Sequence, residues 1–198
     1  MEYHEAVYAL NHELETKYNG LHRHCLRVAR YSLMIAQALA VDEIQQRSLY
    51  DGAIIHDIGK IMIPENILNK PGKLSETEFR LVKKHTTAGY IIAKKTGVLE
   101  SLLPSILYHH ERIDGKGYPA GLCDAEIPLN AKIIAIADSF DAMTCNRPYR
   151  KAMPLDAAIS ELIANSGSQF DSNLVEMFLS SPNFGILDEQ LGSVANEA

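Results

Sequence analysis

The sequence predicts an all-α fold, and three observations support this prediction. Apolar residues recur at helical spacing through nearly the whole chain of 198 residues. Helix start and stop signals separate these stretches from one another. No pair of alternating segments joined by a tight turn marks a β-hairpin. With 46% apolar and 22% charged residues, the composition is that of an ordinary globular protein, and the length suits one domain with a substantial core.

Two helices are expected at the N-terminus, over residues 2–18 and 22–40. Between them lies Asn19-Gly20, a pair of residues that commonly ends a helix. It is expected to end the first helix. The second helix has leucine and alanine residues every three or four positions, which is typical of a helix packed on a core. The sequence leaves open whether the first helix links to a sensory domain or only caps the bundle.

A third helix is expected over residues 41–60, with Asp42 as its N-cap. Its second half is strongly apolar, which indicates that this half is buried. Prolines and a Pro-Gly pair then interrupt the chain and predict an irregular connector. Ser75 and Glu78 form an S-x-x-E capping box, and the helix that they open is expected to run to about Gly97.

Four more helices are expected in the second half of the chain. A short helix with an early proline occupies residues 100–111. The run IIAIA within residues 129–146 is short enough for a strand, but apolar residues continue after it at helical spacing and favour a buried helix. Residues 154–167 and 172–181 supply the last two helices, and the end of the chain is expected to be a frayed tail.

We therefore expect three parts: an N-terminal helix over residues 1–18, a main domain over residues 19–180 and a tail over residues 181–198. The formal charge of −6 argues against a general binder of DNA or of membrane surfaces, since such proteins usually carry a basic face. The chain has no signal-peptide block and no apolar stretch long enough to span a bilayer. Its three scattered cysteines fit a reducing compartment, so a cytoplasmic location is expected.

Five histidines and two aspartates lie on predicted inner faces or at the ends of elements. A single buried histidine is usually a hydrogen-bonded core residue, but seven such groups together indicate a site. An aspartate beside the apolar run IIAIA costs several kcal/mol to bury unless it is paired or bound to a metal. Imidazole and carboxylate ligands together suit iron, manganese or zinc. The candidate ligands are His24, His56, Asp57, His85, His109, His110 and Asp138.

The stretch HHERIDGKGYP, residues 109–119, follows two of these histidines directly into a loop. Its glycines allow tight turns and a close approach of the backbone to a phosphate. Pro119 restricts Tyr118 toward an extended conformation, so that the ring is held in place. The same residues are also good turn formers in any protein, but their position beside two candidate ligands favours a binding loop. Cys25, next to His24, is expected to be a small core residue rather than a ligand.

These motifs resemble the HD-GYP branch of the HD-domain phosphohydrolases. The resemblance rests on HDIGK, residues 56–60, and on HHERIDGKGYP, and it extends from about Gly20 to Phe178. The pattern HDxGK alone indicates only the HD superfamily. The full set of motifs, in this order along the chain, is specific to the HD-GYP branch. Further similar segments are HCLRVARY, HDIGKIMIPENILNKPGKLSETE, IPLNAKIIAIADSFDAMTCNRPYRKA and GSQFD.

The resemblance implies a compact multi-helix bundle with two divalent metal ions in its core. One ion would be held by His24, His56, Asp57 and Asp138, and Asp57 would bridge to a second ion held by His85, His109 and His110. Iron or manganese is the expected metal, with zinc, nickel, cobalt or magnesium as alternatives. Some members hold a third ion through a glutamate at the position of Gly20, which has no ligand atoms, so a dinuclear site is expected. His22 could replace the missing glutamate as a ligand, but it is expected to be exposed or to support a ligand without binding the metal.

The resemblance further implies hydrolysis of cyclic di-GMP in bacterial signalling. Asp57 and Lys60 would be the catalytic residues, with a water activated between the metals and Lys60 at the phosphate. Linear pGpG is the expected end product, because completion to GMP is associated with the third ion. Residues that would contact the substrate are Lys60, Asp114, Gly117, Tyr118, Pro119, Asp141, Arg147 and Arg150.

Two other functions remain open at this level. One is an HD phosphohydrolase that acts on another nucleotide or cyclic dinucleotide. The other is a non-catalytic signalling module that binds partner proteins or a cyclic dinucleotide. The resemblance also implies diguanylate cyclase (GGDEF) domains or other signalling proteins as candidate partners, and a homodimer as a candidate assembly, with no role for DNA.

Overall fold

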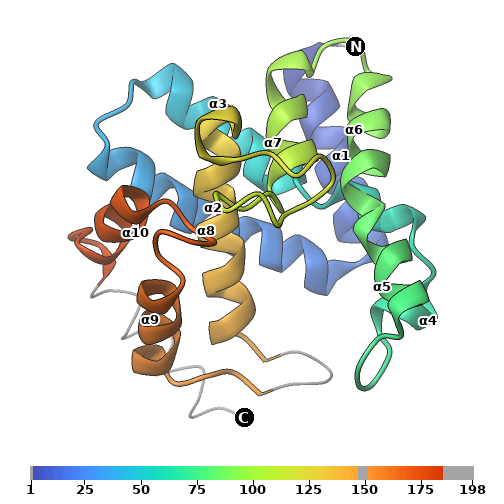
Figure 1. Ribbon diagram of the computed structural model, residues 1–198. Helices are drawn as coiled ribbons and strands as arrows, with labels where there is room; N and C mark the ends of the chain where they lie inside the picture. Colours follow the sequence, from blue (N-terminus) through green and yellow to red (C-terminus); the bar gives the residue numbers. More distant parts are fainter. Residues whose placement is uncertain (1, 147–150, 185–198) are drawn as a thin grey trace.

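The computed structural model describes residues 2–146 and 151–184 (Figure 1). Within these ranges every regular element is an α-helix or a 3₁₀ helix, and β-pairing is limited to two isolated bridges, so the all-α prediction is confirmed. Arg147 and Arg150 lie outside the described residues, as does most of the expected tail. No helix in the described part of the chain is both long enough and apolar enough to cross a membrane.

The first two helices are α1 (Tyr3–Lys17) and α2 (Asn19–Ala38), joined through Tyr18 alone. The prediction that Asn19-Gly20 ends the first helix is wrong, because these residues form the first turn of α2. The amides of Leu21 and His22 donate to the Tyr18 carbonyl at 2.9 and 3.0 Å, so the backbone turns directly into the next helix. Helix α1 packs on α2 and buries alanine, valine and leucine side chains.

Helix α3 (Glu43–Ile55) begins at the expected cap, where the Asp42 carboxylate accepts a hydrogen bond from the Gln45 amide at 2.8 Å. The helix ends before His56, and the expected last turn is instead the 3₁₀ helix η1 (Ile58–Met62). A single turn of helix, α4 (Glu65–Leu68), lies within the expected connector.

The helix predicted from residue 75 to about Gly97 is in fact two, α5 (Glu76–Lys83) and α6 (His85–Lys94). The Ser75–Glu78 capping box is confirmed, with both of its hydrogen bonds present. The break at Lys84 has a local cause, because the side chains of His85 and Thr86 donate to carbonyls at the end of α5. Sequence periodicity continues through this break, so it gave no warning of it.

The second half of the chain contributes α7 and α8, which position candidate ligands, and two further helices that pack on α8. In Figure 1, α8 runs through the middle of the bundle. The rings of Phe140 on α8, Phe178 on α10 and Tyr31 on α2 meet edge to face in the core. The elements are η2 (Glu100–Leu102), α7 (Leu103–Tyr108), η3 (Asp124–Glu126), α8 (Leu129–Thr144), α9 (Leu155–Ala164) and α10 (Ser172–Leu179).

Gly59 allows η1 to pack directly on the start of α6. A Cβ atom at this position would lie 1.9 Å from the His85 carbonyl oxygen and 2.4 Å from the Gly89 amide nitrogen. Both are backbone atoms, which cannot move aside as a flexible side chain can. The absence of a side chain at Gly59 therefore sets the distance between the segment after α3 and the first residue of α6.

Replacing Gly59 with alanine is expected to destabilise the protein by about 3 kcal/mol, the upper end of the usual cost of overpacking, because the clash is with backbone. Chemical denaturation would measure this loss. Gly20→Ala is the matched control, because a Cβ atom there meets nothing within 4 Å. It lies in a helix, so it is expected to leave stability unchanged or to raise it. Equal unfolding midpoints for the two variants would contradict this account of Gly59.

Candidate metal centre and loop

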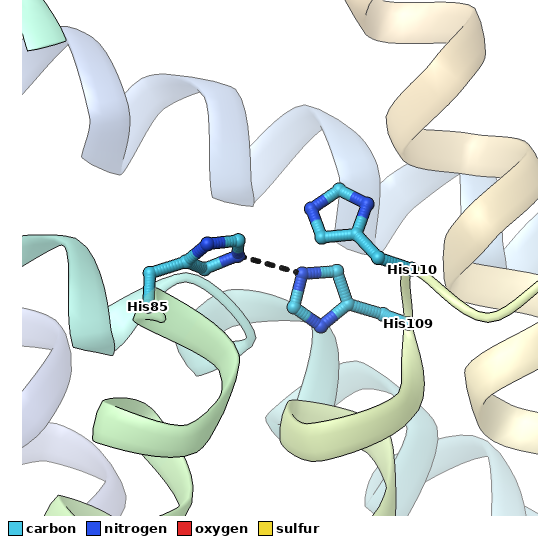
Figure 2. A group of neighbouring side chains, drawn as sticks. All are labelled: His85, His109 and His110. Atoms are coloured by element: carbon cyan, nitrogen blue, oxygen red, sulfur yellow. Dashed lines mark hydrogen bonds between the residues drawn. The ribbon is translucent and has the colours of Figure 1, made fainter. Parts of the chain in front are cut away.

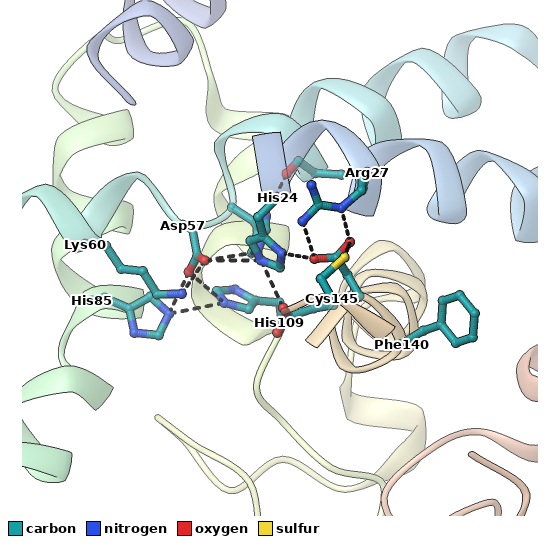
Figure 3. Close-up of polar contacts among 12 residues, drawn as sticks. His24, Arg27, Asp57, Lys60, His85, His109, Phe140 and Cys145 are labelled. Carbon is teal, nitrogen blue, oxygen red and sulfur yellow. Dashed lines mark hydrogen bonds and ion pairs between the residues drawn. The ribbon is translucent and has the colours of Figure 1, made fainter. Parts of the chain in front are cut away.

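The structure brings all seven candidate ligands into one cluster at the centre of the bundle. Figure 3 labels His24, Asp57, His85 and His109 among them. They come from five places in the fold: α2, the end of α3, the first residue of α6, the end of α7 and the middle of α8. Their side-chain donors form two groups, within each of which the ligand atoms lie within 4.8 Å of one another. One group is His24, His56 and Asp138, and the other is His85, His109 and His110.

Asp57 lies between the two groups and presents one carboxylate oxygen to each. Its Oδ2 is 3.4 Å from Nε2 of His56 and 3.7 Å from Nε2 of His24. Its Oδ1 is 3.2 Å from Nε2 of His85 and 3.9 Å from Nε2 of His109. A carboxylate with its two oxygens directed to separate sets of imidazoles is suited to bridge two cations.

Backbone contacts determine which ring nitrogen of three histidines faces the centre. In His56, His85 and His109, Nδ1 lies 2.6, 2.8 and 2.9 Å from the carbonyl oxygen three residues earlier, where it donates. Nε2 is then the unprotonated nitrogen of each neutral ring. Figure 2 shows the result for one pair, in which Nε2 of His85 and Nε2 of His109 face each other at 3.2 Å. A contact this short between two ring nitrogens is satisfied either by a shared proton or by a cation bound to both.

Charges of four residues in the cluster match those of metal ligands, whereas the pKa of His24 is raised because hydrogen bonds to Asp138 and Asp141 outweigh the lowering by burial. Burial holds the pKa of His109 well below its usual range and lowers that of His110 to about 3, so both imidazoles are neutral near pH 7. Burial acts to raise the pKa of Asp57, but Lys60 and the surrounding imidazoles lower it well below its usual range. The pKa of Asp138 is likewise lowered by His24 against the effect of burial. Neutral imidazole and ionised carboxylate are the forms that bind metals.

Several buried polar atoms of the cluster lack a hydrogen-bond partner among the described residues. These atoms are Nε2 of His24, Nε2 of His56 and Oδ1 of Asp57. Two of them still have a close polar contact, His24 Nε2 with Asp138 Oδ1 at 3.1 Å and Asp57 Oδ1 with His85 Nε2 at 3.2 Å. A buried polar atom without any partner costs about 1–3 kcal/mol, which here applies most fully to Nε2 of His56. All three face the middle of the cluster, where a cation would satisfy them. The residues present therefore fit a metal centre.

Asp141 holds the His24 ring in position through its Nδ1 atom and does not face the cluster centre. Its Oδ2 lies 2.6 Å from His24 Nδ1, which donates to it, and it accepts two hydrogen bonds from Arg27, at 2.5 and 3.0 Å. The Asp141 side chain is buried, and a direct contact of this residue with substrate stays a prediction. Arg27 was missed in the sequence, although it lies one helical turn after His24 on the same face of α2.

Replacing Arg27 with methionine is expected to weaken metal affinity about 10- to 100-fold, the usual cost of losing a residue that orients a ligand. Without the guanidinium, Asp141 loses two hydrogen bonds that hold its carboxylate against His24. Titration of the metal-free protein with manganese would measure the apparent affinity. Arg30→Met, an exposed arginine of the same helix, is the control. Equal affinities for the two variants would show that Arg27 does not position His24.

Lys60 reaches the cluster from η1 and forms an ion pair with Asp57 Oδ2. The pair joins residues one turn apart, and the lysine side chain is mostly buried. An ammonium group therefore lies at the edge of the metal centre, next to the carboxylate that separates the two groups of imidazoles.

The loop after α7 is held by a buried carboxylate that the sequence motifs did not single out. Both oxygens of Glu111 accept hydrogen bonds from backbone amides of residues 120–122, at 2.7 to 3.1 Å. Gly117 packs against this glutamate so closely that a Cβ atom would lie 2.4 Å from the Glu111 Cα atom. The Tyr118 ring stacks on His110, with the ring centres 4.8 Å apart. The expected anchoring of Tyr118 is thus present, and the peptide bond to Pro119 is cis.

Asp114 has a structural role in this loop. Its carboxylate accepts two hydrogen bonds from Arg112, at 2.9 and 2.7 Å, and one from the Lys116 amide at 3.1 Å. The paired arginine lowers the pKa of Asp114 to about 2. Because its oxygens are taken up in this way, the expected substrate contact by Asp114 is not supported.

Two residues beside the cluster were also weighed from the sequence. Cys25 packs in a small core group with Leu14 and Ile58, as expected, although its sulfur also comes within 4.8 Å of ligand atoms of His56 and Asp57. Burial holds the pKa of the Cys25 thiol well above its usual value, which favours the neutral core residue. Gly20 is exposed, with nothing within 4 Å of the position of a Cβ atom.

Comparisons with known proteins agree with this geometry. A family model described as an HD domain matches residues 9–174. A cyclic di-GMP phosphodiesterase of Thermotoga maritima is 42% identical over 177 residues, which are 88% of this chain and 48% of the relative. A 3'3'-cGAMP-specific phosphodiesterase of Vibrio cholerae is 41% identical over 148 residues, which are 75% of this chain and 32% of the relative. The solved structure of Bd1817, an HDG"Y"P protein from Bdellovibrio bacteriovorus, superposes with a TM-score of 0.67 at 22% identity, over 80% of this chain and 51% of that one. The chain thus spans about half or less of the length of these proteins.

Proposed function

Because the chain belongs to the HD-domain family, in its HD-GYP branch, we propose that it is a metal-dependent phosphodiesterase that hydrolyses cyclic di-GMP. One observation carries the proposal: Asp57 presents its two carboxylate oxygens to two separate groups of imidazoles. Paired cations are a recurring arrangement for the cleavage of phosphate esters, and the two groups of ligands that share Asp57 support such a pair here.

The proposed site holds two divalent cations, with iron or manganese preferred. His24, His56 and Asp138 would hold one, and His85, His109 and His110 the other, with Asp57 shared between them. When bound, the cations would lower the pKa of a water and withdraw charge from the phosphate. Imidazoles and carboxylates also accept zinc, nickel or cobalt, so the ligands alone do not select the metal.

The remaining chemistry belongs to residues of the chain. Lys60 would stabilise the charge that develops on the phosphoryl oxygens, because its ammonium lies beside Asp57. Either Lys60 or a solvent water would protonate the leaving sugar oxygen. Tyr118 and Gly117 would line the approach to the centre, since both border the cavity beside His109 and His110. Arg147 and Arg150 stay predicted phosphate contacts.

We propose linear pGpG as the end product. A third cation would need another ligand near His24, and the exposed Gly20 has no side chain to supply one. Further hydrolysis to GMP is the alternative outcome.

A second substrate has specific support, because a relative 41% identical to this chain is named as specific for 3'3'-cGAMP. The two cyclic dinucleotides differ in one base and share the phosphodiester that is cleaved. The non-catalytic alternative is less well supported, because a histidine or an aspartate is present at each of the seven ligand positions and these side chains lie together.

The test is a product assay under anaerobic conditions with iron or manganese. Purified protein is incubated separately with cyclic di-GMP and 3'3'-cGAMP, and the products are separated by chromatography. Faster loss of cyclic di-GMP with accumulation of pGpG is expected. Protein that contains metal but cleaves neither dinucleotide would contradict the proposal and favour a binding module.

Location and partners remain proposals. A cytoplasmic location is supported by three free cysteines, which fit a reducing compartment. Binding to diguanylate cyclase (GGDEF) domains and self-association are predictions that co-purification and light scattering would test.

A further inference from the structure

A cavity of about 300 Å³ opens beside the metal centre, between α5, the loop after α7 and the turn that precedes α10. Two candidate metal ligands, His109 and His110, form part of its wall. Phe79 and Lys83 of α5 and Gln169 of the turn form other parts, and none of these three was given a role on sequence grounds. A ligand in this cavity would adjoin any phosphate bound at the metal centre.

The aromatic side chains of the wall leave one ring available for stacking. Tyr118 stacks on His110, and the Lys83 ammonium lies 4.9 Å from the centre of the same ring. The ammonium also lies 4.8 Å from the centre of the Phe79 ring, which is 48% exposed. A large apolar ring half exposed at the rim of a cavity is a stacking surface for a planar ligand such as a nucleobase.

The polar groups of the wall are mainly hydrogen-bond donors. The carboxylate oxygens of Glu111 are occupied by backbone amides, and the side-chain oxygen of Gln169 accepts from Arg112 at 2.6 Å. Gln169 can therefore offer a ligand its amide hydrogens and one remaining lone pair, and the Ser139 hydroxyl can donate or accept. Lys83 and Lys116 can only donate. A ligand that presents acceptors is favoured here over one that presents a donor.

Guanine and adenine differ in the number of hydrogen-bond acceptors that they present. Along one edge guanine presents two acceptors, N7 and O6, whereas adenine presents the acceptor N7 and the donor N6–H₂. We infer that this cavity is a base subsite selective for guanine, in which Phe79 stacks on the base while Lys83 and Gln169 donate to its acceptor edge. The inference rests on the proposed function, and it names the residues that would separate cyclic di-GMP from adenine-containing dinucleotides.

The test compares kcat/KM for cyclic di-GMP, cyclic di-AMP and bis(p-nitrophenyl) phosphate, a phosphodiester without bases. The unaltered protein is expected to prefer cyclic di-GMP over cyclic di-AMP by at least about tenfold. Phe79→Ala is expected to lower kcat/KM for both dinucleotides about tenfold, because stacking does not distinguish purines. Lys83→Met is expected to lower kcat/KM mainly for cyclic di-GMP. The ratio of kcat/KM for cyclic di-GMP to kcat/KM for cyclic di-AMP should therefore fall about fivefold or more. For Lys83→Met the loss on bis(p-nitrophenyl) phosphate, which lacks the acceptor edge of guanine, is expected to be much smaller.

Matched controls lie on the neighbouring helix α6. Ile91→Ala removes an apolar side chain that is also 48% exposed, and Lys94→Met removes an ammonium that lies over the Tyr90 ring at 5.4 Å. Neither residue lines the cavity, so both variants are expected to retain the guanine preference.

The possible failures can be told apart. No hydrolysis of any of the three substrates by the unaltered protein would overturn the proposed function. Hydrolysis of both dinucleotides with equal kcat/KM would leave that function standing and overturn the guanine subsite. An equal fall on both dinucleotides in Lys83→Met would place Lys83 on a phosphate, and would overturn its assignment to the base.

Discussion

Asp57→Asn is expected to reduce phosphodiesterase activity to near background and to lower the bound metal content. The substitution keeps the shape of the side chain but removes the charge and one acceptor oxygen, so a single amide must face both groups of imidazoles. Residues that only support a ligand cost about 10- to 100-fold in activity when replaced, and the loss of a shared ligand is expected to exceed that range. Metal analysis and a hydrolysis assay on the same preparation would measure both effects.

Asp51→Asn is the matched control for this substitution. Asp51 is also buried and also belongs to the α3 segment, but it accepts a hydrogen bond from Tyr3 at 3.0 Å, away from the cluster. An asparagine can accept the same bond, so activity and metal content are expected to stay close to those of the unaltered protein. A fully active Asp57→Asn protein with its full metal content would refute the bridging assignment.

Removing divalent cations with a chelator is expected to lower the thermal stability of the protein as well as its activity. Without cations, the ring nitrogens of His85 and His109 face each other, and three buried polar atoms lack hydrogen-bond partners among the described residues. A ligand present at 100 times its dissociation constant stabilises the folded state by about 2.7 kcal/mol. For a chain of this size that corresponds to a fall in the unfolding midpoint of about 5–11 °C. A calorimetric scan with and without chelator would measure it.

The Asp57→Asn variant also serves as the control for this experiment. Its cluster is expected to bind cations weakly, so the chelator should shift its unfolding midpoint much less. If the chelator left the midpoint of the unaltered protein in place, the cluster would be stable without cations, and the metal assignment would be wrong.

Two helix caps whose interacting groups are close in sequence were predicted correctly. The cap at Asp42 and the box formed by Ser75 and Glu78 each join groups three residues apart, so a short stretch contains all of the interaction. Two boundaries were misread because local signals competed with packing. Gly20 resembles a helix stop but lies in the first turn of α2, and periodicity concealed the break at Lys84 that places His85 at the start of α6.

Residue types and spacing were sufficient to select the seven candidate ligands, because ionisable groups are costly to bury and so many of them are rarely placed in a core unless they form a site. The positioning residues were found only in the folded chain. Arg27 acts through Asp141, a residue 114 positions away, and Phe79 meets Tyr118 only through the Lys83 ammonium that lies over both rings. The position of Arg27 one helical turn after His24 was a weak local signal, whereas the residues next to Phe79 in the chain do not mark it as part of a site.

The sequence by itself thus determined the helical class, the identity of the ligands and the loop that follows them. Only the tertiary structure decided which oxygen of Asp57 faces each group of ligands, which residues hold the ligands in position, and which donors surround the neighbouring cavity. The physical reason is that periodicity and capping act within a few residues, whereas this geometry is set by the packing of helices that are distant in the chain.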